Sequence, residues 1–91
     1  YAAPIDPIPV AMYTLDLSWD KEATHTRDVE SFLPLRTMQA FAAEGRIGRL
    51  ADRFYGVPTE FSQRRTNTLD APQVLRLCRE DNVDVVILVP L

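Results

Sequence analysis

The chain has 91 residues, of which 46% are apolar and 25% are charged, and its formal net charge is −3. This length permits one small domain with a modest core. No apolar run approaches the roughly 20 residues of a membrane-spanning helix. The acidic balance argues against nucleic acid as a partner, because phosphate binding requires a concentrated basic surface. The composition therefore predicts a soluble protein that binds neither membrane nor nucleic acid.

The amino-terminal stretch YAAPIDPIPV contains three prolines, at positions 4, 7 and 9. Each proline fixes its own φ angle and biases the preceding residue away from helix. We therefore expect residues 1–10 to form an extended arm. The stretch has no basic leader and lacks the pattern of a secretory signal peptide. Residues 10–17 carry strand-forming side chains in partial alternation and predict a strand, and the polar residues 18–28 predict a loop.

Two helical pieces are expected in the middle of the chain. The first begins at Pro34, which suits a first helical turn, and ends at Gly45, because glycine adopts a left-handed cap conformation at little cost. Apolar residues recur between them at helical spacing, at Leu35, Met38, Phe41 and Ala42. A second piece is expected over residues 46–56, with four apolar side chains facing inward, namely Ile47, Leu50, Ala51 and Phe54.

The carboxyl-terminal third predicts a helix followed by a buried strand. Thr68 or Asp70 suits the helix cap, Pro72 suits its first turn, and the helix should break at Asp81. Six of the seven residues 83–89 are apolar and most are β-branched, which is typical of a strand covered on both faces of a parallel sheet. The fold class expected from this pattern is α/β, a small parallel-sheet, Rossmann-like fragment with packed helices, in one partial domain over residues 1–91.

His25 is the only histidine, and Asp28 follows it by three residues. Histidine is the side chain best suited to proton transfer near neutral pH, and a nearby carboxylate can orient it. The alternative is a solvated loop histidine, which is the commoner case for a histidine among polar residues. No cysteine or second histidine stands at ligand spacing from it, so we expect no metal site, and no phosphate-binding glycine loop or other cofactor motif is present.

The single cysteine, Cys78, cannot form an internal disulfide and fits a reducing compartment, which predicts a cytoplasmic protein. Its position beside Val74 and Leu77 on one helical face favours a small buried residue over an exposed nucleophile. Three arginines, Arg46, Arg49 and Arg53, would share a face of the second helical piece. An anion site is one interpretation of that face. Interleaved acidic residues favour a solvated surface instead.

Taken together, residues 24–56 and 71–91 resemble the selenoprotein B family of glycine, sarcosine, betaine and D-proline reductases. The family pattern is a polar loop with histidine and aspartate, an apolar–proline–leucine step, a helix ending in E-G-x-I-G, a leucine–alanine step and an aromatic turn. A helix and a V-D-x-V strand with a nearby proline follow. The matching residues here are His25, Asp28, Leu33, Pro34, Leu35, Glu44, Gly45, Ile47, Gly48, Leu50, Ala51, Phe54, Tyr55, Gly56, Val83, Asp84, Val86 and Pro90.

The resemblance implies reductive cleavage of a C–N bond in an amino acid or amine. In the family, a selenocysteine or cysteine stands just after the V-D-x-V strand and acts as the nucleophile. That residue is expected beyond Leu91, so no catalytic residue is assigned in this chain. His25 and Asp28 are carried over as substrate-pocket candidates, and Val89 and Pro90 as the scaffold that aims the nucleophile. Many relatives have threonine where Val89 stands, so the pocket is expected to differ.

The resemblance also implies partners, namely other reductase subunits and a small amino acid or amine substrate. The alternative function is a non-catalytic α/β subunit that lends a sheet edge or a helix face to a larger complex. In either case an open sheet edge invites pairing, so we expect a homo-oligomer.

Overall fold

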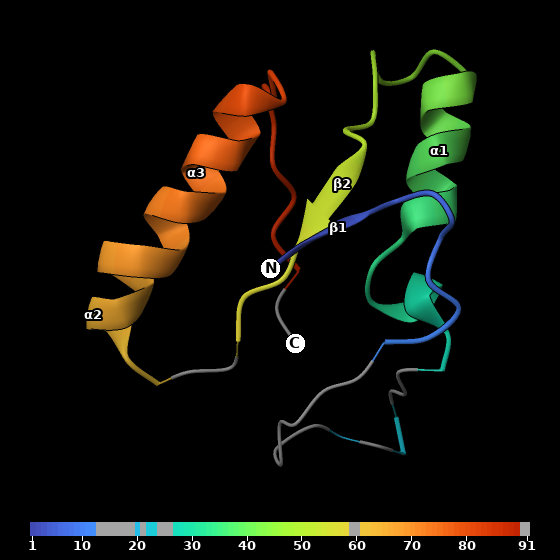
Figure 1. Cartoon of the computed structure of the whole chain (residues 1–91). Coiled ribbons are helices and arrows are strands. Elements are labelled where there is room, and N and C mark those ends of the chain that lie inside the picture. The colour runs from blue at the N-terminus through green and yellow to red at the C-terminus, as the bar shows by residue number, and fades with distance from the viewer. Residues whose placement is uncertain (13–19, 21, 24–26, 59–60, 90–91) are drawn as a thin grey trace.

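A computed structural model describes residues 1–12, 20, 22–23, 27–58 and 61–89 (Figure 1). The described elements, in chain order, are β1 (Ala2–Pro4), the 3₁₀ turn η1 (Val29–Ser31), α1 (Leu35–Ala43), β2 (Arg53–Tyr55), α2 (Gln63–Arg65), the π-helical turn η2 (Thr66–Asp70) and α3 (Ala71–Glu80). In Figure 1, α1 and α3 lie on opposite sides of the two strands.

The sheet of the described residues has two strands and is antiparallel. Ala3 of β1 pairs with Phe54 of β2, and the ladder continues in both directions through hydrogen bonds that join Ile5 N–H to the Asp52 carbonyl and Gly56 N–H to the Tyr1 carbonyl, each at 3.0 Å. The expected parallel, Rossmann-like sheet is therefore wrong. Residues 83–89, which we call the extended segment, follow α3 with a bend at Asp84, belong to no helix or strand and join no ladder among the described residues.

That error has a physical cause. A run of apolar, β-branched residues indicates that a segment favours an extended, buried conformation. Such a run does not determine which strand pairs with the segment. Pairing is a non-local property. Here the amino-terminal arm, of which residues 2–4 form β1, supplies the partner of β2 from about fifty positions away in the chain.

The first predicted helix is confirmed as α1, and it ends as expected at Gly45. Gly45 has a φ angle of 73°, and hydrogen bonds from Gly45 N–H to the Ala42 carbonyl and from Arg46 N–H to the Phe41 carbonyl close the last turn. This pairing of the last carbonyls is the Schellman motif, which requires a left-handed residue just past the helix. The Arg46 guanidinium then lies 4.0 Å from the centre of the Phe41 ring.

The second predicted helical piece is wrong. The chain bends over residues 46–48, and Arg53–Tyr55 form the strand β2. Phe54 packs against the core from this strand, and its two neighbours point to the other face. These contacts outweigh the local helical spacing, as tertiary packing commonly does for a short segment. A helical face shared by Arg46, Arg49 and Arg53 consequently does not exist.

The last predicted helix is confirmed, and it begins earlier than expected. Ser62, rather than Thr68 or Asp70, caps it: the Ser62 hydroxyl accepts a hydrogen bond from Arg65 N–H at 3.2 Å. Helical backbone then runs without a break through α2, η2 and α3 (Figure 1). Pro72 lies in the first turn of α3, and Cys78 is buried, as its apolar neighbours predicted.

The core is small. Val29, Phe32 and Leu35 form its buried centre, each less than 9% exposed. Five partly buried apolar residues pack against this centre, namely Ile5, Ile8, Met12, Leu33 and Phe54. This core therefore joins the amino-terminal arm, the η1–α1 region and β2, and none of its residues belongs to α3, whose buried residue is Cys78.

Candidate functional site

The sequence-predicted site residues lie on separate parts of the chain. Asp28 is exposed and caps η1, because its Oδ1 accepts a hydrogen bond from Glu30 N–H at 3.1 Å. Val89 lies near the end of the extended segment and is 37% exposed. No hydrogen bond or ion pair links these two among the described residues. His25 and Pro90 lie outside the described residues.

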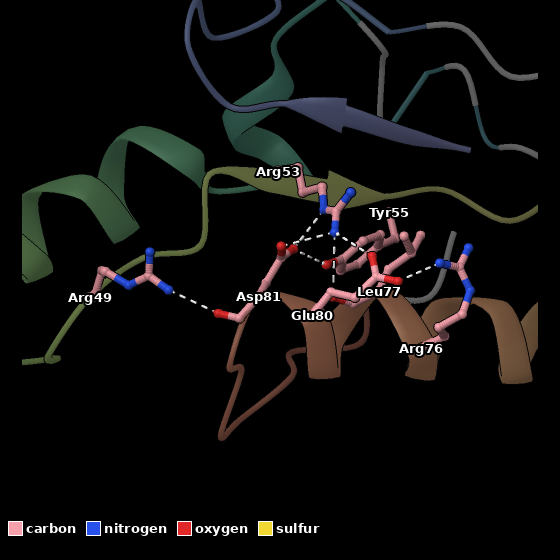
Figure 2. A network of polar contacts seen from close by, with 7 residues as sticks. All are labelled: Arg49, Arg53, Tyr55, Arg76, Leu77, Glu80 and Asp81. Atoms are coloured by element: carbon pink, nitrogen blue, oxygen red, sulfur yellow. Dashed lines mark hydrogen bonds and ion pairs between the residues drawn. The ribbon is translucent and has the colours of Figure 1, made fainter.

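A polar cluster that the sequence analysis missed holds β2 to the end of α3 (Figure 2). Arg53 donates two hydrogen bonds to the Asp81 carboxylate, from Nε to Oδ2 at 2.6 Å and from Nη2 to Oδ1 at 2.9 Å. The Tyr55 hydroxyl donates a third to Oδ2 at 2.7 Å. Two-pronged pairing of a guanidinium with a carboxylate is the geometry that gives such pairs both strength and orientation. We call Arg53, Tyr55 and Asp81 the anchor cluster.

The local backbone explains how these side chains meet. Residues two apart in a strand point to the same face, so β2 places Arg53 and Tyr55 together. Asp81 follows the last residue of α3, where it is partly buried. The sequence signal of this shared face is an arginine and a tyrosine two positions apart, with the apolar Phe54 between them.

The electrostatics of the anchor cluster fix its protonation states. Hydrogen bonds from Arg53 and then from Tyr55 hold the pKa of the Asp81 carboxyl below its ordinary value. Burial, and next the hydrogen bond to Asp81, raise the pKa of the Tyr55 phenol to about 12. The hydrogen bond to Asp81 also raises the pKa of the Arg53 guanidinium. A general acid or base needs a pKa near the working pH, so these shifts point to a structural role.

Further arginine contacts bind the carboxyl end of α3. Arg49 donates from Nη2 to the Asp81 carbonyl at 2.9 Å, and Arg53 Nη2 lies 3.5 Å from both the Leu77 carbonyl and a Glu80 carboxylate oxygen. The last carbonyls of a helix lack partners within it and carry partial negative charge. Two cationic side chains at this position therefore satisfy and stabilise the helix end.

The chain turns sharply beyond this point. Asn82 has a φ angle of 54°, its N–H donates to the Arg79 carbonyl at 3.2 Å, and Val83 N–H donates to the Cys78 carbonyl at 2.9 Å. This is a second Schellman motif, with asparagine in the left-handed position. It sets the direction in which residues 83–89 leave the helix.

The extended segment itself is apolar and open to solvent. Val85 is 80% exposed, Ile87 61% and Leu88 86%. Among the described residues, its backbone makes no hydrogen bond after that of Val83. Contiguous exposed apolar residues of this kind mark interaction sites more often than single ones do.

Concave space near the anchor cluster is slight. A hollow of about 20 Å³ lies between the strand end and the helix, lined by Tyr1, Gly56, Val57, Asp70, Gln73, Val74 and Leu77. That volume is room for about one water molecule. It is too small for an amino acid substrate.

The part of the chain that the structure describes has neither a metal-binding cluster nor a membrane-spanning helix. No group of three or more histidine, cysteine, aspartate or glutamate side chains is arranged to hold a metal ion. No helix among the same residues is long and apolar enough to cross a membrane.

Comparisons with known proteins give no assignment. No protein-family model matches the sequence. No curated protein matches it, and no solved structure does so either.

Proposed function

We propose that this chain is part of a reductase of the selenoprotein B type, which cleaves the C–N bond of glycine, sarcosine, betaine or D-proline. The proposal rests on the family motifs and on one structural observation. The segment that follows the E-G-x-I-G motif and the segment that opens the V-D-x-V motif are joined by the anchor cluster and by Arg49 (Figure 2). Two stretches that carry the resemblance are therefore neighbours in space.

The proposed chemistry is nucleophilic. A selenolate or low-pKa thiolate beyond Leu91 attacks the α-carbon of the substrate, a carbon–selenium or carbon–sulfur bond forms, and the C–N bond breaks. The amine leaves with the bonding electron pair and takes up a proton. The covalent adduct passes to a partner subunit, which supplies the electrons of the reduction. We place this assembly in the cytoplasm, in keeping with the unpaired Cys78.

In this mechanism the chain supplies the support of the nucleophile. Residues 83–90 carry the nucleophile, with Val89 and Pro90 as the scaffold that the resemblance implies, and the anchor cluster fixes where this segment starts. His25 and Asp28 are the residues that the resemblance assigns to the substrate side of the site, and an imidazole is suited to giving the leaving amine its proton.

The test is an activity assay on the full-length gene product together with its partner subunits. We expect C–N cleavage of one of the four substrates, detected as amine release from glycine, sarcosine or betaine or as ring opening of D-proline, and its loss after alkylation of the nucleophile by iodoacetamide. Absence of C–N cleavage in all four would contradict the proposal.

Two variants of the same full-length protein test the pocket residues. His25→Ala should lower turnover, whereas unchanged turnover would remove His25 from the site. Asp28→Asn keeps a side-chain oxygen for the cap of η1 and removes only the charge. It should therefore change turnover without lowering the unfolding midpoint. A lower midpoint with unchanged turnover would leave Asp28 a capping residue alone.

The exposed segment supports a second candidate function. A chain that leaves Val85, Ile87 and Leu88 more than half exposed is suited to adding a strand to a partner. On this alternative the chain is a non-catalytic assembly subunit, and the segment is its binding element.

A further inference from the structure

Residues 85–89 form the longest run of exposed apolar side chains in the described part of the chain. Residues 83–89 lie outside the helices and strands there, and beyond Val83 N–H their backbone makes no hydrogen bond among the described residues. Alternate residues of an extended segment share a face. Here Val83, Val85, Ile87 and Val89 lie on one face, and all four are β-branched. The other face carries Asp84, Val86 and Leu88.

The segment is complementary to itself when two copies run antiparallel with Val86 at the centre. Directly opposite residues in an antiparallel pair share a face. In this register, Val83 of one copy lies opposite Val89 of the other, and Val85 opposite Ile87, so the β-branched faces become continuous. Asp84 lies opposite Leu88, and the two carboxylates stay apart. The only charge within the segment therefore meets no like charge.

Two kinds of register lose this match. A shift by one residue exchanges the faces and sets Asp84 among the β-branched side chains, which buries a carboxylate without a partner. A shift of the centre to Asp84 sets two carboxylates directly opposite each other, which is destabilising. Of the registers that keep the faces matched, the one centred on Val86 pairs all seven residues, whereas a centre at Val85 or Ile87 pairs five.

We propose that two copies of this chain associate through antiparallel pairing of residues 83–89 about a two-fold axis at Val86. The contact supplies the backbone hydrogen bonds that the segment lacks and covers its apolar side chains. Two seven-residue strands bury less than the roughly 1,600 Å² of a standard stable interface, so the dimer is in equilibrium with the monomer. This inference specifies the second candidate function and is independent of the reductase chemistry, since its tests measure association alone.

The first test is sedimentation equilibrium of the 91-residue chain over a wide concentration range. We expect the mass to rise from the 10.3 kDa of the monomer to about twice that value. Val86→Lys sets two like charges opposite each other and should abolish the rise. Val10→Lys is the matched control, because Val10 is 83% exposed and lies outside the segment. A monomer at every concentration, or equal loss of association in both variants, would overturn the proposal.

A second test reads the register without depending on affinity. Opposite residues in an antiparallel pair have Cα atoms about 4.5–5.5 Å apart, within the range that a disulfide spans. Val86→Cys should therefore form a covalent dimer on mild oxidation. Val85→Cys should form much less, because two copies of residue 85 are diagonal neighbours roughly 7–8 Å apart. The buried Cys78 is present in both and serves as the common background. Equal cross-linking of both variants, or cross-linking of Val85→Cys alone, would refute this register.

Discussion

The Asp81 carboxylate receives three hydrogen bonds from two side chains of β2, and its own carbonyl accepts a fourth from Arg49. One residue therefore joins the strand, the end of α3 and the start of the extended segment. Because the cluster of Val29, Phe32 and Leu35 contains no residue of α3, we expect this polar attachment to contribute more to stability than a surface ion pair usually does.

Asp81→Asn tests that role. Asparagine keeps the size of the side chain but cannot accept charged hydrogen bonds from both guanidinium nitrogens and the phenol. We expect a lower urea midpoint, and hydrogen exchange at the Val83 amide faster by about tenfold, because the turn at Asn82 opens more often. Asp84→Asn is the control, since Asp84 is exposed and lies three residues farther along. Equal effects of the two changes would contradict the anchoring role.

The pH dependence of stability follows from the same residues. The Asp81 pKa is lower in the folded chain than its ordinary 3.8, so its contribution is present above pH 3.8 and is lost as the pH falls through the folded value. The Tyr55 pKa rises from 10.0 to about 12, so its contribution is present below pH 10 and is lost as the pH rises towards 12.

Phenolate absorbance during an alkaline titration measures this directly. The chain has three tyrosines. We expect the step of highest pKa to disappear in Tyr55→Phe, and the unfolding midpoint of that variant to depend less on pH between 10 and 12. A titration curve that keeps its highest step in Tyr55→Phe would show that this phenol is not the shifted group.

At the scale of elements, the amino terminus of α1 is capped by the side chain of Glu30, which lies outside the helix. Pro34 offers no side-chain cap, and Glu30 takes its place: its carboxylate oxygens accept from Arg36 N–H at 2.6 Å and from Thr37 N–H at 3.3 Å. Burial opposes ionisation of Glu30, but these hydrogen bonds outweigh it and lower its pKa. A carboxylate at a helix amino terminus also meets the favourable end of the helix dipole.

Glu30→Ala should lower the free energy of unfolding by about 0.5–2 kcal/mol, the usual cost of losing an amino-terminal cap. Urea denaturation measures it. Glu44→Ala is the matched control, because Glu44 lies at the other end of α1, where a negative charge is unfavourable. Its removal should leave stability unchanged or raise it slightly. Destabilisation by Glu44→Ala to the same extent would refute the capping argument.

The elements that the sequence predicted well are those with local causes. Gly45 ends α1 because of its own backbone freedom, and the spacing of Val74, Leu77 and Cys78 marks one face of α3. The strand β2 was not predicted, because its pairing partner is the distant segment of residues 2–4. The cap of α1 by Glu30 was not predicted either, because Glu30 lies six positions before Arg36, whose N–H donates to it. In the anchor cluster, Arg53 binds Asp81 from 28 positions away, and no local sequence pattern predicts a contact over that separation.

At the scale of the whole molecule, the described residues include few buried side chains and a run of exposed apolar ones at 85–89. Leu35→Ala removes one of three central core residues, 5% exposed, and should cost about 2–5 kcal/mol. This loss is a large part of the 5–15 kcal/mol typical of a folded domain, so urea denaturation followed by circular dichroism should show a much lower midpoint. Val10→Ala, at an exposed valine, should keep the native midpoint. An unchanged midpoint for Leu35→Ala would contradict this description of the core.

The reductase proposal requires a nucleophile after residues 83–89, and we assign none among the 91 residues. The most direct measurement is the nucleotide sequence immediately downstream of the Leu91 codon. The proposal predicts an in-frame UGA or cysteine codon there, with a second cysteine codon shortly after it. An ordinary stop codon followed by no such coding sequence would contradict it and leave the assembly subunit as the function of the chain.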